Sequence, residues 1–522
     1  MREYPAPTVD SRFLSTGLRA DYRAPINAPH LLEALNVRCH ENGISPYEPM
    51  IQPFGDSIAL YGIEMSWPFP MIFRGKSKTF LVDRSAIFYV NEGDWTLWEM
   101  QTFDAANPTV TKAIQPGRAW SFVDFFDTWF FSNGINTVFH SNRHLMKGEE
   151  DKIYVFDRVR IEAGCDHRGR ALFGGFEEEY FWSDEWKNFY ETEAKKASTG
   201  LSIKLSDLRE NFVMWSTIGG GDLLFLFHQD LAETGFMSSD YGSGDELIWD
   251  FLRRNEWGFM PMAWQGKVRE IKPFGKSVIV YGDGGVTALT PYQDPTPTYG
   301  AEELSTIGIH NTGAVGGDDK THLYLDQGGA LWLLESGSGL KKLGYESIFG
   351  LWNNDTVLIS FNSREREFWI SNGIETYYLS RTGLSKTSQI VSSIAGYTQG
   401  YHIGLGSLME DEDQSFKIKT GTFDLGSRGL KTITEVELGI DSTVDVYVSI
   451  EFRYEKNGQW METVAYPVNS EGIAYPRVEC LEFRVIVSGS DYRSINLDYV
   501  NVFYQKSDKR GRRGLDASPA NT

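Results

Sequence analysis

Short runs of alternating apolar and polar residues, separated by turns rich in glycine and asparagine, fill most of the first 400 residues. Residues 129–141 (WFFSNGINTVFHS) and 368–380 (FWISNGIETYYLS) both place Ser-Asn-Gly-Ile between two runs of aromatic and β-branched residues. Alternation predicts half-buried strands, and Asn-Gly supplies the positive φ that a tight hairpin turn requires. We therefore predict the same β-hairpin at both places.

A second internal repeat extends this pattern. Residues 51–62 (IQPFGDSIALYG) and 271–282 (IKPFGKSVIVYG) are identical at seven of twelve positions. Weaker copies of the hairpin pattern occupy 88–98, 280–290 and 324–334, and the turn glycines Gly284, Gly328 and Gly373 are 44 and 45 residues apart. A repeat of this length with about four short strands per unit is typical of a β-propeller blade. We predict an all-β chain with a propeller of six or seven blades over 51–408. No repeated pattern of Gly-His followed by Trp-Asp occurs, which excludes WD40 repeats.

The interval between Gly134 and Gly284 is too long for its strands, so we expect a helical insertion at about 160–215 and 240–258. Trp182, Trp186, Phe189 and Glu193 follow helical spacing. Ser243 and Glu246 form a capping box that predicts a second short helix. We expect both helices to lie on one face of the propeller.

Both ends of the chain differ from the repeats. From 409 to 505 the strands are longer and lack the blade period, at 432–440, 444–455, 479–489 and 495–505, which predicts a C-terminal β-sandwich-like domain. Residues 506–522 are expected to form a flexible basic tail. The proline-containing residues 1–50 are expected to form an extended N-terminal arm.

Charge and cysteine content narrow the function. Acids outnumber bases by 71 to 50, and a net charge of −21 argues against a protein that wraps DNA. Three cysteines, far apart and odd in number, favour reduced thiols made in a cytoplasm over a disulfide framework. We find no apolar signal segment and no run long enough to span a membrane.

No motif in the sequence specifies catalysis. Gly275-Lys276-Ser277 resembles the end of a phosphate-binding loop, but the sister turn is Gly55-Asp56-Ser57, which favours a structural turn. His140 with His144, and Cys165 with His167, are isolated pairs without further zinc ligands at suitable spacing. We therefore predict no catalytic residue, no metal and no cofactor, although two carboxylates brought together in space would escape this search.

Three segments carry a resemblance to a known family: 35–49 (LNVRCHENGISPYEP), 211–232 (NFVMWSTIGGGDLLFLFHQDLA) and 495–514 (INLDYVNVFYQKSDKRGRRG). With the turns described above, they resemble the tail nozzle proteins of short-tailed bacteriophages, also called packaged-DNA stabilisation proteins. The resemblance implies a non-enzymatic, propeller-bearing subunit, six around an axis, that extends and closes the portal and adaptor channel. The chain differs from the best-known nozzles in its length and in its acidic, aromatic insertion.

The implied partners are other copies of the chain in a hexamer, the adaptor and portal rings, and tail needle, fibre or plug proteins. Genomic DNA would pass through the lumen without specific binding, and the protein would be assembled in the host cytoplasm into the virion tail. A ring of six such chains carries a charge of −126, which favours sliding of DNA over adhesion. The candidate subunit and partner contacts are Arg38, Tyr47, Phe176, Glu178, Trp182, Trp186, Arg510, Arg512 and Arg513.

Two alternatives from other classes stay open. A propeller-based glycan hydrolase or depolymerase would need only a pair of suitably placed acids. A glycan- or receptor-binding module would use aromatic side chains at blade tips, such as Trp95, Trp98 and Trp332, as stacking surfaces.

Overall fold

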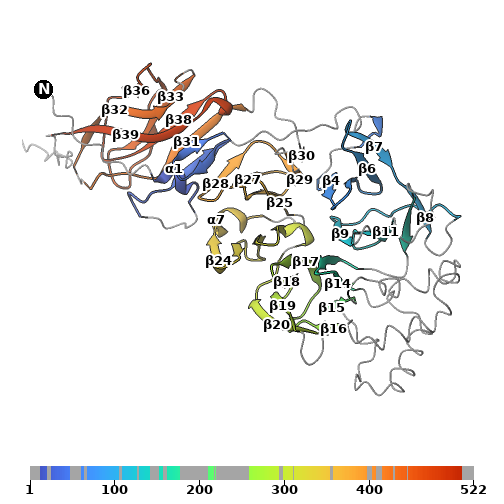
Figure 1. Cartoon of the computed structure of the whole chain (residues 1–522). Helices are drawn as coiled ribbons and strands as arrows, with labels where there is room; N and C mark the ends of the chain where they lie inside the picture. The colour runs from blue at the N-terminus through green and yellow to red at the C-terminus, as the bar shows by residue number, and fades with distance from the viewer. Residues whose placement is uncertain are drawn as a thin grey trace, which may run out of the picture.

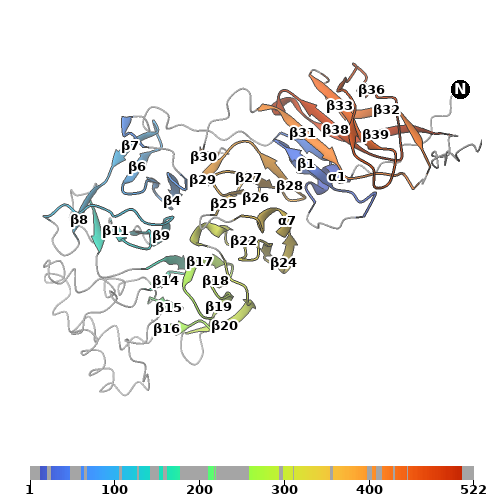
Figure 2. The same ribbon diagram turned by 180° about the vertical axis from the view of Figure 1, so that it is seen from behind.

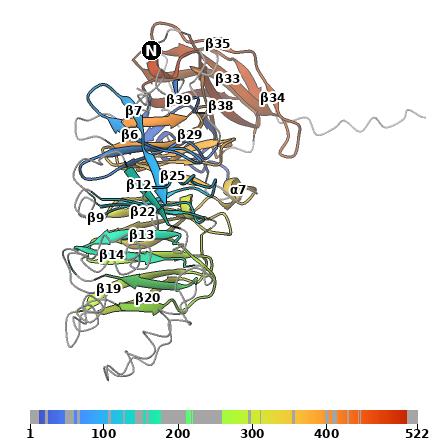
Figure 3. The ribbon, with the colours of Figure 1, turned by 90° about the vertical axis from the view of Figure 1, so that its right-hand side faces the viewer.

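The computed structural model describes residues 12–19, 25–46, 60–63, 67–104, 109–125, 128–141, 152–156, 161–176, 210–216, 218, 258–292, 298–309, 311–352, 357–396, 402–406, 414–426, 429–441, 443 and 445–507. Small antiparallel sheets follow one another around a common centre, and a larger two-sheet unit stands at one side (Figure 1). The view from behind shows the same ring of sheets, and the edge-on view shows it as a stack of strands beneath that unit (Figures 2 and 3). The architecture is an all-β propeller joined to a β-sandwich.

Seven propeller sheets occur in chain order over the described residues. The first sheet holds β4 (Met71–Arg74), β5 (Thr79–Val82), β6 (Ile87–Asn91) and β7 (Thr96–Glu99). The second holds β9 (Ser121–Phe125), β10 (Thr128–Ser132), β11 (Thr137–Ser141) and β12 (Lys152–Phe156), and β8 (Gln101–Asp104) pairs parallel with β12. The third holds β13 (Ala163–His167), β14 (Arg170–Gly174), β15 (Phe212–Trp215) and β16 (Gly258–Pro261).

The fourth sheet holds β17 (Val268–Phe274), β18 (Ser277–Gly282), β19 (Val286–Tyr292) and β20 (Thr298–Ser305). The fifth holds β21 (Val315–Gly317), β22 (Thr321–Leu325), β23 (Leu331–Glu335) and β24 (Gly339–Gly344). The sixth holds β25 (Leu358–Asn362), β26 (Glu367–Ser371), β27 (Thr376–Leu379) and β28 (Leu384–Thr387), and the seventh holds only β29 (Val391–Gly396) and β30 (His402–Gly406). Short helices lie between them at η2 (Thr312–Ala314) and α7 (Glu346–Phe349). No helix among the described residues is long and apolar enough to cross a membrane.

The predicted hairpins are confirmed where the structure describes them. Strands β10 and β11 pair from Thr128↔Ser141 to Ser132↔Thr137, and the sister strands β26 and β27 pair around the second Asn-Gly turn. Their turn glycines Gly134 and Gly373 have φ of 77° and 86°, as the Asn-Gly pattern requires. Lys276 lies in the two-residue turn between β17 and β18, which confirms the structural interpretation of Gly275-Lys276-Ser277.

The first strands of the sheets surround the centre of the propeller. Strand β13 packs between β9 and β17, β25 packs between β21 and β29, and β29 also contacts β4. Phe73 of β4 stacks on Phe122 of β9 with ring centroids 5.4 Å apart, which joins the first two sheets. The two-stranded sheet β29–β30 thus occupies the space between the sixth sheet and the first.

The expected insertion at about 160–215 is too wide. Residues 163–174 and 212–215 form β13, β14 and β15, which are strands of the third propeller sheet. The expected helices lie outside the described residues. Two connections interrupt this sheet. The first joins β14 to β15 at the end of the sheet where Gly174 pairs with Val213. The second joins β15 to β16 at the opposite end, where Trp215 pairs with Gly258. The two interruptions therefore lie at opposite ends of β15.

The C-terminal unit contains two sheets that share one core. One sheet holds β31 (Phe416–Thr420), β38 (Glu482–Gly489), β33 (Val446–Arg453), β34 (Met461–Glu462) and β35 (Tyr466–Pro467), and the other holds β2 (Arg38–His40), β3 (Gly43–Ser45), β39 (Leu497–Lys506), β32 (Lys431–Ile440), β36 (Ile473–Ala474) and β37 (Val478–Cys480). A short helix η4 (Tyr492–Ser494) precedes β39. The four long strands predicted from the sequence are β32, β33, β38 and β39.

The N-terminal residues belong to this sandwich and do not form a separate arm in their described part. Helix α1 (Phe13–Thr16) and strand β1 (Leu31–Leu35) lie between the sandwich and the sixth propeller sheet. Strand β1 pairs antiparallel with β31 and parallel with β28, so a single ten-stranded sheet runs from the propeller into the sandwich. The sequence pattern could not show this pairing, because the partners lie more than 350 residues apart.

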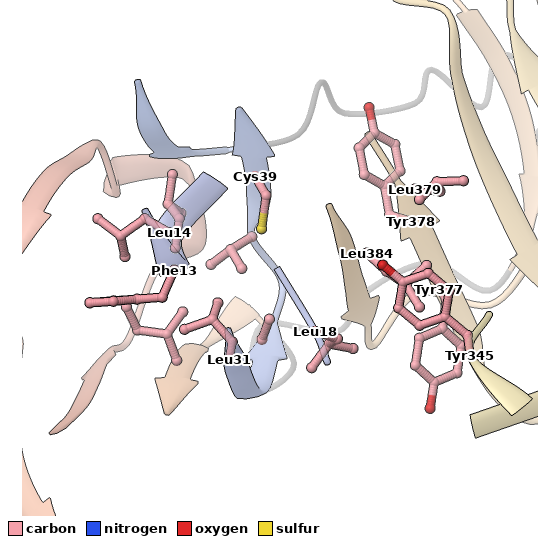
Figure 4. Close-up of a cluster of buried hydrophobic side chains, with 14 of the residues drawn as sticks. Phe13, Leu14, Leu18, Leu31, Cys39, Tyr345, Tyr377, Tyr378, Leu379 and Leu384 are labelled. Atoms are coloured by element: carbon pink, nitrogen blue, oxygen red, sulfur yellow. The ribbon is translucent and has the colours of Figure 1, made fainter. Parts of the chain in front are cut away.

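The hydrophobic core is also continuous across this junction. Phe13, Leu14 and Leu31 from the N-terminal residues are fully buried in the same cluster as Tyr378 and Leu384 from the propeller (Figure 4). Sandwich residues such as Ile418 and Val448 belong to the same cluster. Burial on this scale opposes independent motion of the two units, because separating them would expose apolar surface to water.

Candidate functional site

Of the predicted contact residues, the structure describes Arg38 and Phe176. Tyr47, Glu178, Trp182, Trp186, Arg510, Arg512 and Arg513 lie outside the described residues. Phe176 is 1% exposed, so this side chain belongs to the interior and does not contact a partner. The prediction failed for Phe176 because an aromatic residue next to an acidic run has the same sequence signature whether it is buried or exposed.

Arg38 is engaged within the chain. Its Nε donates to Oε1 of Glu367 at 3.0 Å, and its Nη2 donates to Oε2 of Glu365 at 2.9 Å. The Tyr378 hydroxyl donates to the other oxygen of Glu367. Burial raises the pKa of Glu367, while Tyr378 and Arg38 oppose that rise. Arg38 therefore joins the sandwich strand β2 to the sixth propeller sheet, and its role as a partner contact stays a prediction.

Asn36 forms hydrogen bonds with both units at the same junction. This residue is fully buried and has a φ of 55°. Its side-chain oxygen accepts from the backbone N–H of Ser388 at 2.8 Å, and its amide donates to the carbonyl of Ser415 at 2.7 Å. Ser388 follows the last strand of the sixth sheet and Ser415 precedes β31, so one side chain links the propeller to the sandwich.

A cavity of about 420 Å³ lies at the centre of the propeller. Its walls come from the first strands β4, β9, β17, β21 and β25, together with η2. Glu270 and Lys272 of β17 both line it, because alternate residues of a strand point to the same side. Glu270 is 7% exposed, and burial raises the pKa of its carboxyl group. Sequence reasoning missed this pair, although an acid and a base two residues apart in a mostly apolar strand are a usable signal.

A charged cluster closes one end of this centre, where the first strands begin. The Glu162 carboxylate, 4% exposed, pairs with Arg269 at 2.7 Å, with Arg118 at 3.4 Å and with Lys267. Arg269 also pairs with Asp283 at 2.7 Å. Because these groups come from three neighbouring propeller sheets, their mutual attraction ties the sheets together around the axis.

His322 and the three cysteines are buried inside the protein. His322 donates from Nε2 to the Pro273 carbonyl at 3.1 Å, and Nδ1 accepts from the Tyr281 hydroxyl at 2.9 Å. Burial lowers the pKa of His322 to about 3. Cys39, Cys165 and Cys480 are buried free thiols. Among the described residues, no three His, Cys, Asp or Glu side chains gather closely enough to hold a metal ion.

The exposed apolar side chains include two on segments that a hydrogen bond joins. Leu351 is 84% exposed and Ile374 is 74% exposed. The indole of Trp352 donates to the Glu375 carboxylate at 3.4 Å, which holds the loop after α7 beside the turn between β26 and β27. Of the suggested stacking aromatics, Trp98 is 58% exposed, whereas Trp332 is partly buried and donates to Asp326.

Comparison with known proteins gives no family. No family model and no curated protein matches the chain. Solved structures resemble it only distantly. PorZ, a surface component of the type-IX secretion system of Porphyromonas gingivalis, is 10% identical with a TM-score of 0.31, and the match covers 67% of this chain and 35% of PorZ. This chain therefore spans about a third of the PorZ chain.

Two further structures are similarly distant. The Pan2 WD40 domain of Neurospora crassa is 8% identical over 69% of this chain and 89% of that chain, with a TM-score of 0.31. The extracellular domain of BT4673 from B. thetaiotaomicron is 9% identical over 92% of this chain and 63% of that chain, with a TM-score of 0.35.

Proposed function

We propose that the chain is a non-enzymatic structural subunit of a viral tail, a tail nozzle subunit that extends and closes the portal and adaptor channel. In this role it retains the packaged genome and lets it pass during ejection. The observation that carries the proposal is the junction at β1, where one sheet and one hydrophobic core run from the propeller into the sandwich. A wall that holds back packaged DNA needs subunits without an internal hinge.

The net charge supports the same role. At −21 per chain, a ring of six repels DNA as a whole, so DNA would move along the lumen without adhering. Specific affinity for DNA would slow ejection. Retention would then depend on a narrow gate and on plugging partners.

Leu351 and Ile374 are candidate contacts between subunits. Both are large apolar side chains that are more than 70% exposed, and the hydrogen bond between Trp352 and Glu375 joins the loop and the turn that carry them. We infer a homo-oligomer, a hexamer in the assembled virion tail, with adaptor or portal rings and needle, fibre or plug proteins as partners. Assembly would take place in the host cytoplasm.

Two measurements on the purified full-length chain test this proposal. Light scattering with size-exclusion chromatography should show a discrete ring of six, alone or after addition of the adaptor ring. A monomer that never joins the adaptor would contradict the proposal. Incubation with capsule or lipopolysaccharide should release no reducing ends, whereas their release would favour the hydrolase alternative.

A further inference from the structure

The central cavity has the composition of a small-molecule site. Its volume of about 420 Å³ falls within the usual range for ligand pockets of roughly 300–1,000 Å³. It runs along the first strands from Thr312, beside the Glu162 cluster, to Ser363 at the exposed rim. Apolar and aromatic side chains share its walls with a few hydroxyl and charged ones, which is the usual composition of a ligand pocket.

Two charged side chains in the cavity, Glu270 and Lys272, form fewer hydrogen bonds with the described part of the protein than they can. Glu270 accepts one hydrogen bond, from the backbone N–H of Ile271 at 3.1 Å, and the nearby Lys272 ammonium partly offsets the rise in the pKa of Glu270 that burial causes. A carboxylate can accept about four hydrogen bonds and an ammonium group can donate three. Both groups therefore retain hydrogen-bonding capacity for a ligand.

The opposite walls supply apolar and hydroxyl contacts. The rings of Phe73 and Phe122, stacked at 21° to each other, line the cavity from β4 and β9. Ser360 lines it from β25. An aromatic surface suits the C–H face of a sugar ring, and serine suits its hydroxyl groups.

We propose that this cavity binds a monosaccharide-sized sugar acid. The Lys272 ammonium pairs with the ligand carboxylate, and Glu270 accepts hydrogen bonds from ring hydroxyls. Phe73 and Phe122 pack against the C–H face. Arg74 and Asp318 also line the cavity, and the Asp318 carboxylate is held by the backbone N–H groups of Lys320 and Thr321, both at 2.9 Å. This inference does not depend on the tail-channel proposal.

Calorimetric titration of the full-length protein with glucuronate and, separately, with glucose tests this site. We expect one glucuronate per chain and binding of glucose weaker by about tenfold or more, because a charge-assisted hydrogen bond is lost. Lys272→Met should remove the difference between the two sugars. Lys276→Met, in the exposed turn of the same hairpin, is the matched control and should bind like the unchanged protein.

A rim substitution keeps the test decisive if Lys272→Met does not fold. Ser363→Trp changes an exposed residue and should block entry, so loss of glucuronate binding with an unchanged thermal midpoint supports the site. Glucuronate binding that survives Ser363→Trp contradicts it. Equal affinity for glucuronate and glucose, or no binding of glucuronate at millimolar concentration, would also overturn the proposal.

Discussion

The Arg38 guanidinium and the Glu367 carboxylate meet at 3.0 Å between the sandwich and the propeller. The two residues are 329 positions apart, and Glu367 is only 2% exposed. Arg38→Met should therefore lower the free energy of unfolding by about 3 kcal/mol, because it leaves a buried carboxylate without its cation. Urea denaturation measures this loss.

The matched control is Arg364→Met, in the turn between β25 and β26 that also holds Glu365. Arg364 is 49% exposed, and its pair with Glu365 at 3.7 Å should contribute less than about 1 kcal/mol. Equal effects of the two substitutions would show that the junction does not depend on Arg38.

The two Asn-Gly hairpins allow a comparison of one substitution at two sites. Gly134→Ala and Gly373→Ala both place a Cβ at positive φ, which costs about 1 kcal/mol. At Gly134 the nearest neighbour of that Cβ is Glu162 at 3.9 Å, whereas at Gly373 it would fall on the Trp67 indole. We expect thermal unfolding to show an additional loss of roughly 1–3 kcal/mol for Gly373→Ala alone. A larger loss at Gly134 would contradict the packing described here.

His322 predicts a specific dependence of stability on pH. Its pKa is about 3 in the folded chain, against 6.5 without burial, so the unfolded chain binds the proton more readily. The stability that neutral His322 provides is complete above pH 6.5 and is lost as pH falls toward 3, at about 1.4 kcal/mol per pH unit.

His322→Phe removes this titration. Its free energy of unfolding should be lower at pH 7, because the Tyr281 hydroxyl and the Pro273 carbonyl lose their partner, but it should fall less steeply below pH 6.5. Denaturation curves between pH 7 and pH 4 measure the slope. Parallel slopes in the two proteins would mean that His322 is protonated in the folded chain.

Leu351 and Ile374 predict how assembly can be blocked. Leu351→Glu or Ile374→Glu should prevent ring formation without lowering the thermal midpoint, because each side chain is exposed in the single chain and would bury a charge in the ring. Val464→Glu, at a 71% exposed position of the sandwich, is the control. Light scattering that finds intact rings for the Leu351 and Ile374 variants would exclude this contact.

The sequence predicted those parts of the fold that depend on neighbouring residues. Alternation and Asn-Gly turns act over a dozen residues, so the hairpins at 129–141 and 368–380 could be placed correctly. The pairing of Leu35 with Lys386 depends on a strand far along the chain, so the pattern of neighbouring residues predicts an arm where the structure has a strand. The cavity around Glu270 escaped prediction for the same reason, since its walls come from five different sheets.

We propose that this chain forms part of the axial tube of a viral tail. Electron microscopy of purified particles, with a gold-binding tag on this chain, tests this position most directly. We expect label on the tail axis below the portal, in six copies around the channel. Label on fibres, on the capsid surface or absent from the particle would contradict it.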